Sequence, residues 1–141
     1  MQIKRINNSN EALLKSFLES CSSSLATFRY FQSRPLSIIE NHLATFLAID
    51  DTEHPVAYGH LDPENGIVWL GICVSDKYQG KGYGDLMMKA LVDETARLNI
   101  HEINLTVDKV NLPAIHLYDK YGFKMIKESE KIFWYRWTSL K

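Results

Sequence analysis

The segment "QGKGYG" (79–84) has the composition of an anion-binding turn. It follows a continuous apolar stretch at 66–74 and precedes a run of helical character at 85–98. Glycines let the backbone adopt positive φ and bring N–H groups close to a ligand, and the start of a helix adds unpaired donors and a positive dipole end. Gln79 and Lys81 can add side-chain donors. Three glycines in five residues are equally compatible with a tight strand-to-helix turn that binds nothing.

Spacing argues against two phosphate-binding motifs. A P-loop has serine or threonine directly after its Gly-Lys pair, whereas Gly82 follows Gly80 and Lys81 here. The dinucleotide fingerprint G-x-G-x-x-G would need a glycine where the chain has Asp85. An anion-binding turn requires neither motif, because backbone N–H groups are enough.

A second segment, "NLPAIHLYDKYGF" (111–123), reads as a helix that carries two phenol hydroxyls. Asn111 can cap the start of this helix, and Gly122 suits its exit. Without further context Tyr118 is most simply an aromatic side chain packed on the helix, and Tyr121 is a competing hydroxyl three positions later.

The elements that must position these segments follow from periodicity and turn signals. A helix is expected at 11–20, and an uncertain stretch at 21–41 holds a short helix at 34–42. Strands are expected at 2–6, 43–49, 56–61, 67–74, 103–107, 123–129 and 131–137, with a turn at 62–66. The strand at 67–74 is apolar enough to be buried on both faces. The expected fold is α/β of the α+β kind, with a mixed, largely antiparallel central sheet flanked by helices.

Composition sets further bounds. The 141 residues are expected to form one domain, 1–141. With 16 basic and 17 acidic side chains, the net charge of −1 argues against nucleic-acid binding. Cys21 and Cys73 form no CxxC pair, so we expect no metal and a reduced, cytoplasmic protein. The N-terminus lacks the apolar core of a signal peptide, and no run of about 18 apolar residues predicts a membrane span.

The two segments together resemble the GCN5-related N-acetyltransferase (GNAT) family. That family has an apolar strand, a few polar residues and Q/R-G-x-G-x-G/A at a helix start, and "VSDKYQGKGYGDLMM" (74–88) has this whole pattern. Its second element, N-x-x-A-x-x-L-Y-x-x-x-G-F, corresponds to 111–123. The resemblance covers residues 43–126 well and the first forty residues poorly. It implies a GNAT-like sheet and a single acetyltransferase domain.

The resemblance implies acetyl-CoA as co-substrate and a set of residues that hold it. Main-chain groups of Cys73 and Val74 would pair with the pantetheine arm, as an added strand does. Asn111 would approach the pantetheine or the thiol, and Tyr118 would be the general acid that protonates the leaving thiolate. The pyrophosphate would be held by the turn and the helix start, namely Gln79, Gly80, Lys81, Gly82, Tyr83, Gly84 and Asp85. Cys73 need not be a nucleophile.

The general base is the part of the family's pattern that this sequence does not match. Many members of the family carry a glutamate on the strand before the glycine turn, and 67–74 contains no carboxylate and no histidine. His60, on the preceding strand, is the best candidate, because the pKa of histidine suits a base near neutral pH. It is equally compatible with a hydrogen-bonded core position. Asp62 and Glu64 are expected to be solvated in the turn. A water relay, or an amine that arrives deprotonated, would also serve.

The acceptor site is expected at 25–35, where the first helices and their loop usually wall it in this family. Arg29 and Arg34 lie among aromatic residues and could hold an anionic, ring-bearing acceptor such as a nucleotide-linked amino sugar. The simpler interpretation is a hydrophobic flap with solvated arginines. Trp69 either lines the site or belongs to the core.

The leading hypothesis is an acetyl-CoA-dependent N-acetyltransferase that acts on a primary amine of a small molecule, with an amino sugar among the candidates. One alternative is acetylation of a protein N-terminus or lysine. Another is a CoA-binding sensor without turnover, which the missing strand glutamate leaves open and Tyr118 in its motif opposes. A homodimer through the late aromatic strands is expected as a habit of the family.

Overall fold

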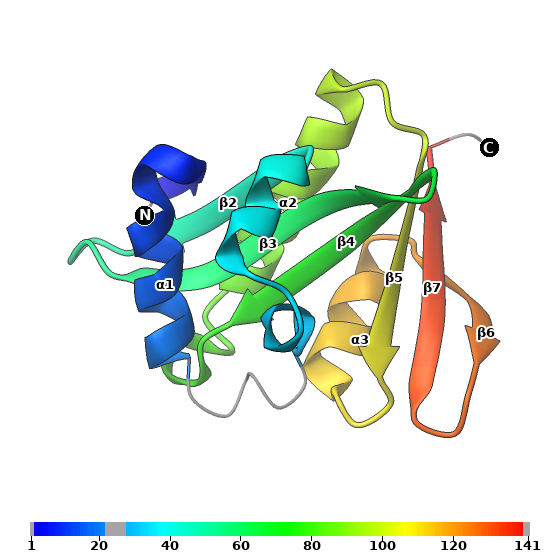
Figure 1. Ribbon diagram of the computed structural model, residues 1–141. Helices are drawn as coiled ribbons and strands as arrows, with labels where there is room; N and C mark the ends of the chain where they lie inside the picture. The colour runs from blue at the N-terminus through cyan, green and yellow to red at the C-terminus, as the bar shows by residue number, and fades with distance from the viewer. Residues whose placement is uncertain (1, 22–27, 140–141) are drawn as a thin grey trace.

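The computed structural model describes residues 2–21 and 28–139. Seven strands form one sheet in the order β1-β2-β3-β4-β5-β7-β6 (Figure 1). Neighbouring strands are antiparallel except β4 and β5, which are parallel. The strands are β1 (Gln2–Arg5), β2 (Ala44–Ile49), β3 (Pro55–Glu64), β4 (Ile67–Val74), β5 (Glu102–Asp108), β6 (Lys124–Glu128) and β7 (Ile132–Thr138). The predicted mixed, largely antiparallel sheet with flanking helices is confirmed.

Helices cover both faces of the sheet. On one face α1 (Glu11–Ser20) buries Leu14 and Phe17, which are three residues apart on one side of the helix. On the other face lie α2 (Tyr83–Arg97) and α3 (Leu112–Lys120), as Figure 1 shows. Short 3₁₀ turns complete the described chain: η1 (Asn8–Asn10), η3 (Tyr30–Gln32), η4 (Leu36–Asn41) and η5 (Asp76–Tyr78). Within the described ranges no helix is long and apolar enough to cross a membrane.

Caps explain where the helices begin. Asn7 accepts a hydrogen bond from the backbone N–H of Ser9 at 2.8 Å, and the Asn10 side chain accepts from the N–H of Asn7, so the polar cluster forms a capping box for η1. Asn10, at the start of α1, makes no side-chain cap hydrogen bond, so this cluster caps the 3₁₀ turn that leads into α1 and not α1 itself. The side chain of Asn111 accepts from the N–H of Ala114 at the start of α3, as the sequence predicts.

The strand β4 differs from the prediction that it is buried on both faces. Only Leu70 and Cys73 are buried in it, and its other residues are half-buried or exposed. The reason is its pairing with β5, which is limited to one register position, Trp69 opposite Asn104. Beyond that position the two strands run apart (Figure 1), so one side of β4 lacks a neighbouring strand.

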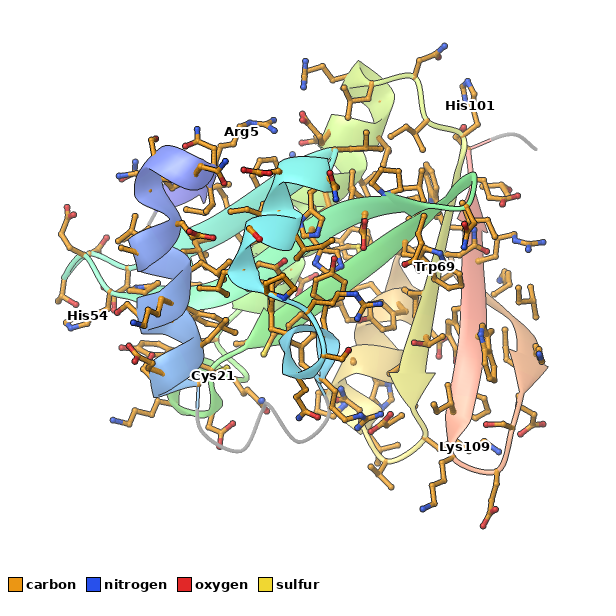
Figure 2. All side chains as sticks on the ribbon, in the orientation of Figure 1. Arg5, Cys21, His54, Trp69, His101 and Lys109 are labelled. Atoms are coloured by element: carbon orange, nitrogen blue, oxygen red, sulfur yellow. The ribbon has the colours of Figure 1, made fainter. Side chains whose placement is uncertain are left out.

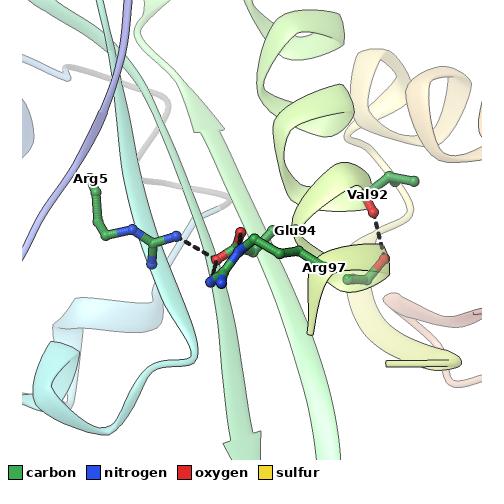
Figure 3. Close-up of polar contacts among 5 residues, drawn as sticks. Arg5, Val92, Glu94 and Arg97 are labelled. Atoms are coloured by element: carbon green, nitrogen blue, oxygen red, sulfur yellow. Dashed lines mark hydrogen bonds and ion pairs between the residues drawn. The ribbon is translucent and has the colours of Figure 1, made fainter. Parts of the chain in front are cut away.

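A buried carboxylate joins α2 to the first strand (Figure 3). Glu94 is 7% exposed and accepts hydrogen bonds from Arg97 at 2.7 and 2.8 Å and from Arg5. The hydrogen bonds from Arg97, and then those from Arg5, hold the pKa of Glu94 at about 2, below its usual 4.5. The ionised form of Glu94 is favoured more strongly in the folded protein than in the unfolded chain. These contacts therefore stabilise the fold at pH values above the unfolded-state pKa of 4.5.

We expect Glu94→Gln to lower the free energy of unfolding at pH 7 by about 2–3 kcal/mol, because the amide cannot hold two guanidinium groups. The wild-type protein should lose this advantage as pH falls from 4.5 toward about 2, where Glu94 becomes protonated. Urea denaturation at pH 7 and at pH 3 measures both effects. The control Asp93→Asn removes an exposed i,i+4 ion pair with Lys89 on the same helix and should cost less than about 0.5 kcal/mol. Equal losses in the two variants would contradict this account.

Candidate functional site

A cavity of about 890 Å³ lies where β4 and β5 run apart. Its walls come from β3, β4, β5, α3, the start of α2 and the segment around η3. All the site residues predicted from the sequence line it except Lys81 and Tyr83, namely His60, Cys73, Val74, Gln79, Gly80, Gly82, Gly84, Asp85, Asn111 and Tyr118. The structure therefore brings two motifs that are distant in the sequence to one space.

The glycines of the turn have two different tasks. Gly80 and Gly82 have φ of +76° and +89°, a region that other residues rarely adopt. The helix α2 begins at Tyr83, two residues before the predicted start, so Gly84 lies in its first turn. A Cβ at Gly84 would lie 3.3 Å from Cδ2 of Leu117, so this glycine lets α2 approach α3. Gly80 and Gly82 thus serve the backbone conformation of the turn, and Gly84 serves the close contact between α2 and α3.

The turn presents backbone donors to the cavity. Leu86 is the first residue of α2 whose N–H reaches back to the cap, at 3.0 Å from the Gly82 carbonyl. The N–H groups of the residues before it in the first turn therefore have no acceptor within the helix. The carboxylate of Asp85 is paired with Lys120, so its negative charge is compensated beside these donors. An anion is the ligand that this arrangement suits.

The two tyrosines of α3 have different surroundings. Tyr121 lies outside the cavity lining, and its hydroxyl donates to the Asp85 carbonyl at 3.2 Å. Tyr118 is 5% exposed and lines the cavity, with its ring held by Phe123 and Tyr135 at centroid distances of 5.7 and 6.4 Å. Its hydroxyl makes no hydrogen bond with any residue that the structure describes. Burial, and then the nearby Cys73 thiol, raise the pKa of Tyr118, so the phenol stays protonated.

His60 projects from β3 over the neighbouring strand. It faces Gly71 in the β3–β4 register, and a Cβ at Gly71 would lie only 2.6 Å from Nε2 of His60. Its Nδ1 lies 2.6 Å from the hydroxyl of Tyr58. Burial, and then the charges of His42 and Arg34, hold the pKa of His60 well below 6.5, so the expectation of a near-neutral pKa is wrong. The ring is neutral at physiological pH.

Asp62 corrects a second expectation. The sequence predicts a solvated carboxylate in a turn, but β3 continues to Glu64, and Asp62 is 5% exposed. It accepts a hydrogen bond from the hydroxyl of Tyr30 at 2.7 Å. The same hydroxyl lies 2.7 Å from Nε2 of His42, whose Nδ1 lies 2.8 Å from the hydroxyl of Thr45. This network fixes η3 against the sheet.

Two arginines near η3 are paired with carboxylates of the protein. Both terminal nitrogens of Arg29 donate to Asp108 at 2.8 Å, which joins the segment before η3 to the end of β5. Arg34 lies over the ring of Tyr30 at 4.3 Å and reaches Glu64 at 3.9 Å. Residues 25–27 of the expected acceptor segment lie outside the described residues. An anionic acceptor would have to compete with these carboxylates.

Cys73 and Trp69 are four positions apart in β4 and so share one face of the strand. The thiols of Cys73 and Cys21 are 3.3 Å apart in the core beneath α1. Figure 2 labels Cys21, at the end of α1, and Trp69. The contact with Cys21, and then burial, raise the pKa of Cys73, so its thiol is protonated and unreactive. Trp69 is half-buried and lines the cavity, which decides between the two interpretations of this residue.

Sequence reasoning missed the side chains that surround His60. Tyr58, His60 and Asp62 alternate along β3, so the period of two places all three on one face, and this signal was available in the sequence. The positions of Gly71, His42 and Thr45 beside them depend on strand register and could not be read from spacing.

Comparisons with known proteins agree with this geometry. The model of the acetyltransferase (GNAT) family matches residues 10–123. The spermine/spermidine N(1)-acetyltransferase of Bacillus subtilis is 42% identical over 65 residues, which are 45% of this chain and 43% of that protein. The L-amino acid N-acetyltransferase AaaT of Escherichia coli is 28% identical over 91 residues, which are 64% of this chain and 52% of that protein. The matches thus span about half the length of these curated relatives.

Solved structures show the same fold. The ribosomal-protein-S18-alanine N-acetyltransferase of Escherichia coli matches with a TM-score of 0.75 and 18% identity, over 97% of this chain and 92% of that chain. The protein yncA of Salmonella typhimurium, solved with its cofactor acetyl-CoA, matches with a TM-score of 0.75 and 16% identity over the same shares, 97% and 92%. At these identities the likeness shows the fold alone.

Substitutions in the glycine turn should separate its two tasks. We expect Gly82→Ala to lower the free energy of unfolding by about 1–2 kcal/mol, because alanine is strained at a φ of +89°. Gly84→Ala should change it by less than about 0.5 kcal/mol, since the gain in helix propensity offsets the tight contact with Leu117. Chemical denaturation of both variants makes the comparison. A larger loss for Gly84→Ala would show that helix packing, and not the turn, limits this segment.

Proposed function

The chain belongs to the acetyltransferase (GNAT) family, and from this premise we propose that it transfers the acetyl group of acetyl-CoA to a primary amine of a small molecule. The observation that carries the proposal is the single cavity that joins the glycine turn, the end of β4 and the hydroxyl of Tyr118. Each of the three would have its own part in holding or cleaving the thioester.

The residues present suit acetyl-CoA. The pyrophosphate would lie against the backbone N–H groups between Gln79 and Asp85, where a helix N-terminus favours an anion. The end of β4, at Cys73 and Val74, has no neighbouring strand on the β5 side, and the pantetheine arm would lie there as an added strand does. The Val74 carbonyl accepts from the side chain of Gln79 at 3.3 Å, so this contact would have to adjust when the arm binds. Asn111 lines the same space from the start of α3. Lys81 and Tyr83 do not line the cavity, and they would contribute only through backbone N–H groups of the turn, whose other residues do line it.

The chemistry would be a direct attack. The amine nitrogen forms a bond to the thioester carbonyl carbon, the C–S bond breaks, and the thiolate leaves with the electron pair. Tyr118 would give its proton to this thiolate, because its hydroxyl faces the cavity without a hydrogen-bond partner in the described chain. The phenolate would regain a proton from the amine nitrogen or from solvent. The protonated thiol of Cys73 does not enter the reaction.

The curated relatives support a small amine as acceptor. By their names they act on spermine, spermidine and L-amino acids. Acetylation of a protein has support only from neighbours such as the S18-alanine acetyltransferase, at 18% identity. The two arginines expected to bind an anionic amino sugar are already paired with carboxylates, Arg29 with Asp108 and Arg34 with Glu64. A CoA-binding sensor would not need the hydroxyl of Tyr118 in the cavity.

We also propose one domain over residues 1–141, supported by the one sheet that contains strands from Gln2 to Thr138. The cytoplasmic location rests on the two free cysteines. The homodimer through the late strands stays a prediction, and the exposed Met125 and Ile126 on the edge strand β6 are compatible with it.

Acetyl-CoA should stabilise the protein. A ligand at about 100 times its Kd that binds only the folded state adds about 2.7 kcal/mol, which corresponds to a rise in Tm of roughly 5–10 °C. A thermal melt with millimolar acetyl-CoA measures this, with acetate as a control that lacks the pyrophosphate and should leave Tm unchanged. An unchanged Tm with acetyl-CoA would remove the assignment of the cavity to this molecule.

Release of free thiol from acetyl-CoA in the presence of different amines tests the function itself. We expect Tyr118→Phe to lower kcat by about 10²–10⁴-fold, because the departing thiolate loses its acid. Its affinity for acetyl-CoA should change little, since the hydroxyl acts on the transition state. Tyr121→Phe is the matched control on the same helix, and it should keep its turnover because this hydroxyl lies outside the cavity lining. Full turnover in Tyr118→Phe would take the acid role from this residue.

A further inference from the structure

The hydrogen bond between Tyr58 and His60 fixes the position of the proton on the imidazole. Tyr58 is fully buried, and among the described residues its hydroxyl has one partner, Nδ1 of His60 at 2.6 Å. The rings of Phe17, Phe28 and Phe31 pack against the ring of Tyr58. A buried O–H group without an acceptor costs about 1–3 kcal/mol, so the hydroxyl donates to Nδ1. Since the ring is neutral, its single proton lies on Nε2.

The cavity is open to this Nε2–H group because residue 71 has no side chain. Any Cβ at Gly71 would lie 2.6 Å from Nε2, so larger residues would cover the nitrogen. No described residue forms a hydrogen bond with Nε2. Every fully buried side-chain nitrogen or oxygen in the described chain has a hydrogen-bond partner. Because Nε2 has no such partner, it is not fully buried and has access to the cavity that His60 lines. The Nε2–H group is therefore available to donate a hydrogen bond to a ligand in the cavity.

The neighbours of His60 place this donor at the acceptor end of the cavity. The rings of Tyr30 and Phe28 lie at centroid distances of 4.4 and 6.3 Å, and both belong to the segment around η3. Tyr30 is fixed there by Asp62 and His42. The glycine turn and α3 line the remainder of the cavity, where acetyl-CoA is proposed. A group bound by His60 thus belongs to the second substrate.

We propose that the acceptor is an amine that carries a hydrogen-bond-accepting oxygen, and that Nε2–H of His60 binds this oxygen. This inference rests on the proposed function and specifies its substrate class. Polyamines do not meet the requirement, because ammonium groups are donors without lone pairs. Amines with a carbonyl, carboxamide or carboxylate group near the nitrogen do. In this role His60 orients the acceptor and takes no proton from it.

The first test reads the tautomer directly and does not depend on any activity. In ¹⁵N-labelled protein, long-range ¹H–¹⁵N correlation spectra distinguish a protonated from an unprotonated ring nitrogen. We expect Nε2 protonated and Nδ1 unprotonated in His60 across pH 6–8, with assignment by comparison with His60→Gln. A proton on Nδ1, or a cationic ring in this range, would overturn the proposal.

The second test compares His60→Gln, which keeps an N–H donor but cannot act as a base, with His60→Ala. The acceptors are phenylalaninamide and 2-phenylethylamine, which differ only in the carboxamide, with spermidine as a third arm. In the wild-type protein we expect kcat/KM to be roughly tenfold higher for phenylalaninamide. His60→Ala should lose this preference and His60→Gln should retain most of it. The fall of kcat/KM at low pH, which is the acidic limb of its pH profile, should be the same in His60→Gln as in the wild-type protein.

The outcomes separate the two proposals. If the wild-type protein prefers spermidine, the proposal of an oxygen-bearing acceptor is overturned. If both substitutions lower kcat/KM equally and the acidic limb of the pH profile is lost, the proposal is also overturned, and His60 returns to the role of base. If none of a broad set of amines is acetylated, the proposed function fails, and the NMR tautomer still decides whether His60 is a donor. If either variant does not fold, the spectra and the acceptor preference of the wild-type protein decide.

Discussion

The parallel strands β4 and β5 pair at one register position, Trp69 opposite Asn104, and the site depends on their separation beyond it. In a continuous sheet, β5 would occupy the space beside the end of β4 and satisfy its main-chain groups. Where the strands run apart, there is room for an extended ligand to lie beside β4. The same separation places α3 opposite β4 and leaves the cavity open between them. The proposed cofactor arm and acceptor would meet in this cavity, between β4 and β5.

Three ionisable side chains that line this cavity, those of Tyr118, His60 and Cys73, are neutral. Burial keeps Tyr118 protonated and His60 uncharged, and the thiol of Cys73 stays protonated beside Cys21. Charged groups near the cavity are paired, as Arg29 is with Asp108 and Asp85 with Lys120. Such a site acts through fixed donors and backbone dipoles, which need no reorganisation when charge develops on a substrate. Neutral groups also avoid the cost of burying an unpaired ion.

Residues from the first third of the chain, Arg29, Tyr30, His42 and Thr45, complete the site through hydrogen bonds with each other, with β3 and with β5. The network of Tyr30, Asp62, His42 and Thr45 fixes η3 on the sheet, and the pair of Arg29 and Asp108 joins the preceding segment to the end of β5. These contacts connect the half of the chain that would hold the acceptor with the half that would hold acetyl-CoA. The proposed selectivity for the acceptor thus comes from residues outside the two family motifs.

The sequence by itself determined the order of the elements, the helices at 11–20 and 111–122, the Asn111 cap of the second helix, the family motifs and most of the residues around the cavity. These features depend on residues a few positions apart, so spacing and propensity are enough to predict them. The tertiary structure alone decided that Asp62 is buried, that Gly84 serves helix packing and that His60 lies over Gly71 as a neutral ring. Burial, pKa and tautomer depend on which strand and helix lie opposite each residue. That register is set by packing between segments that are far apart in the chain.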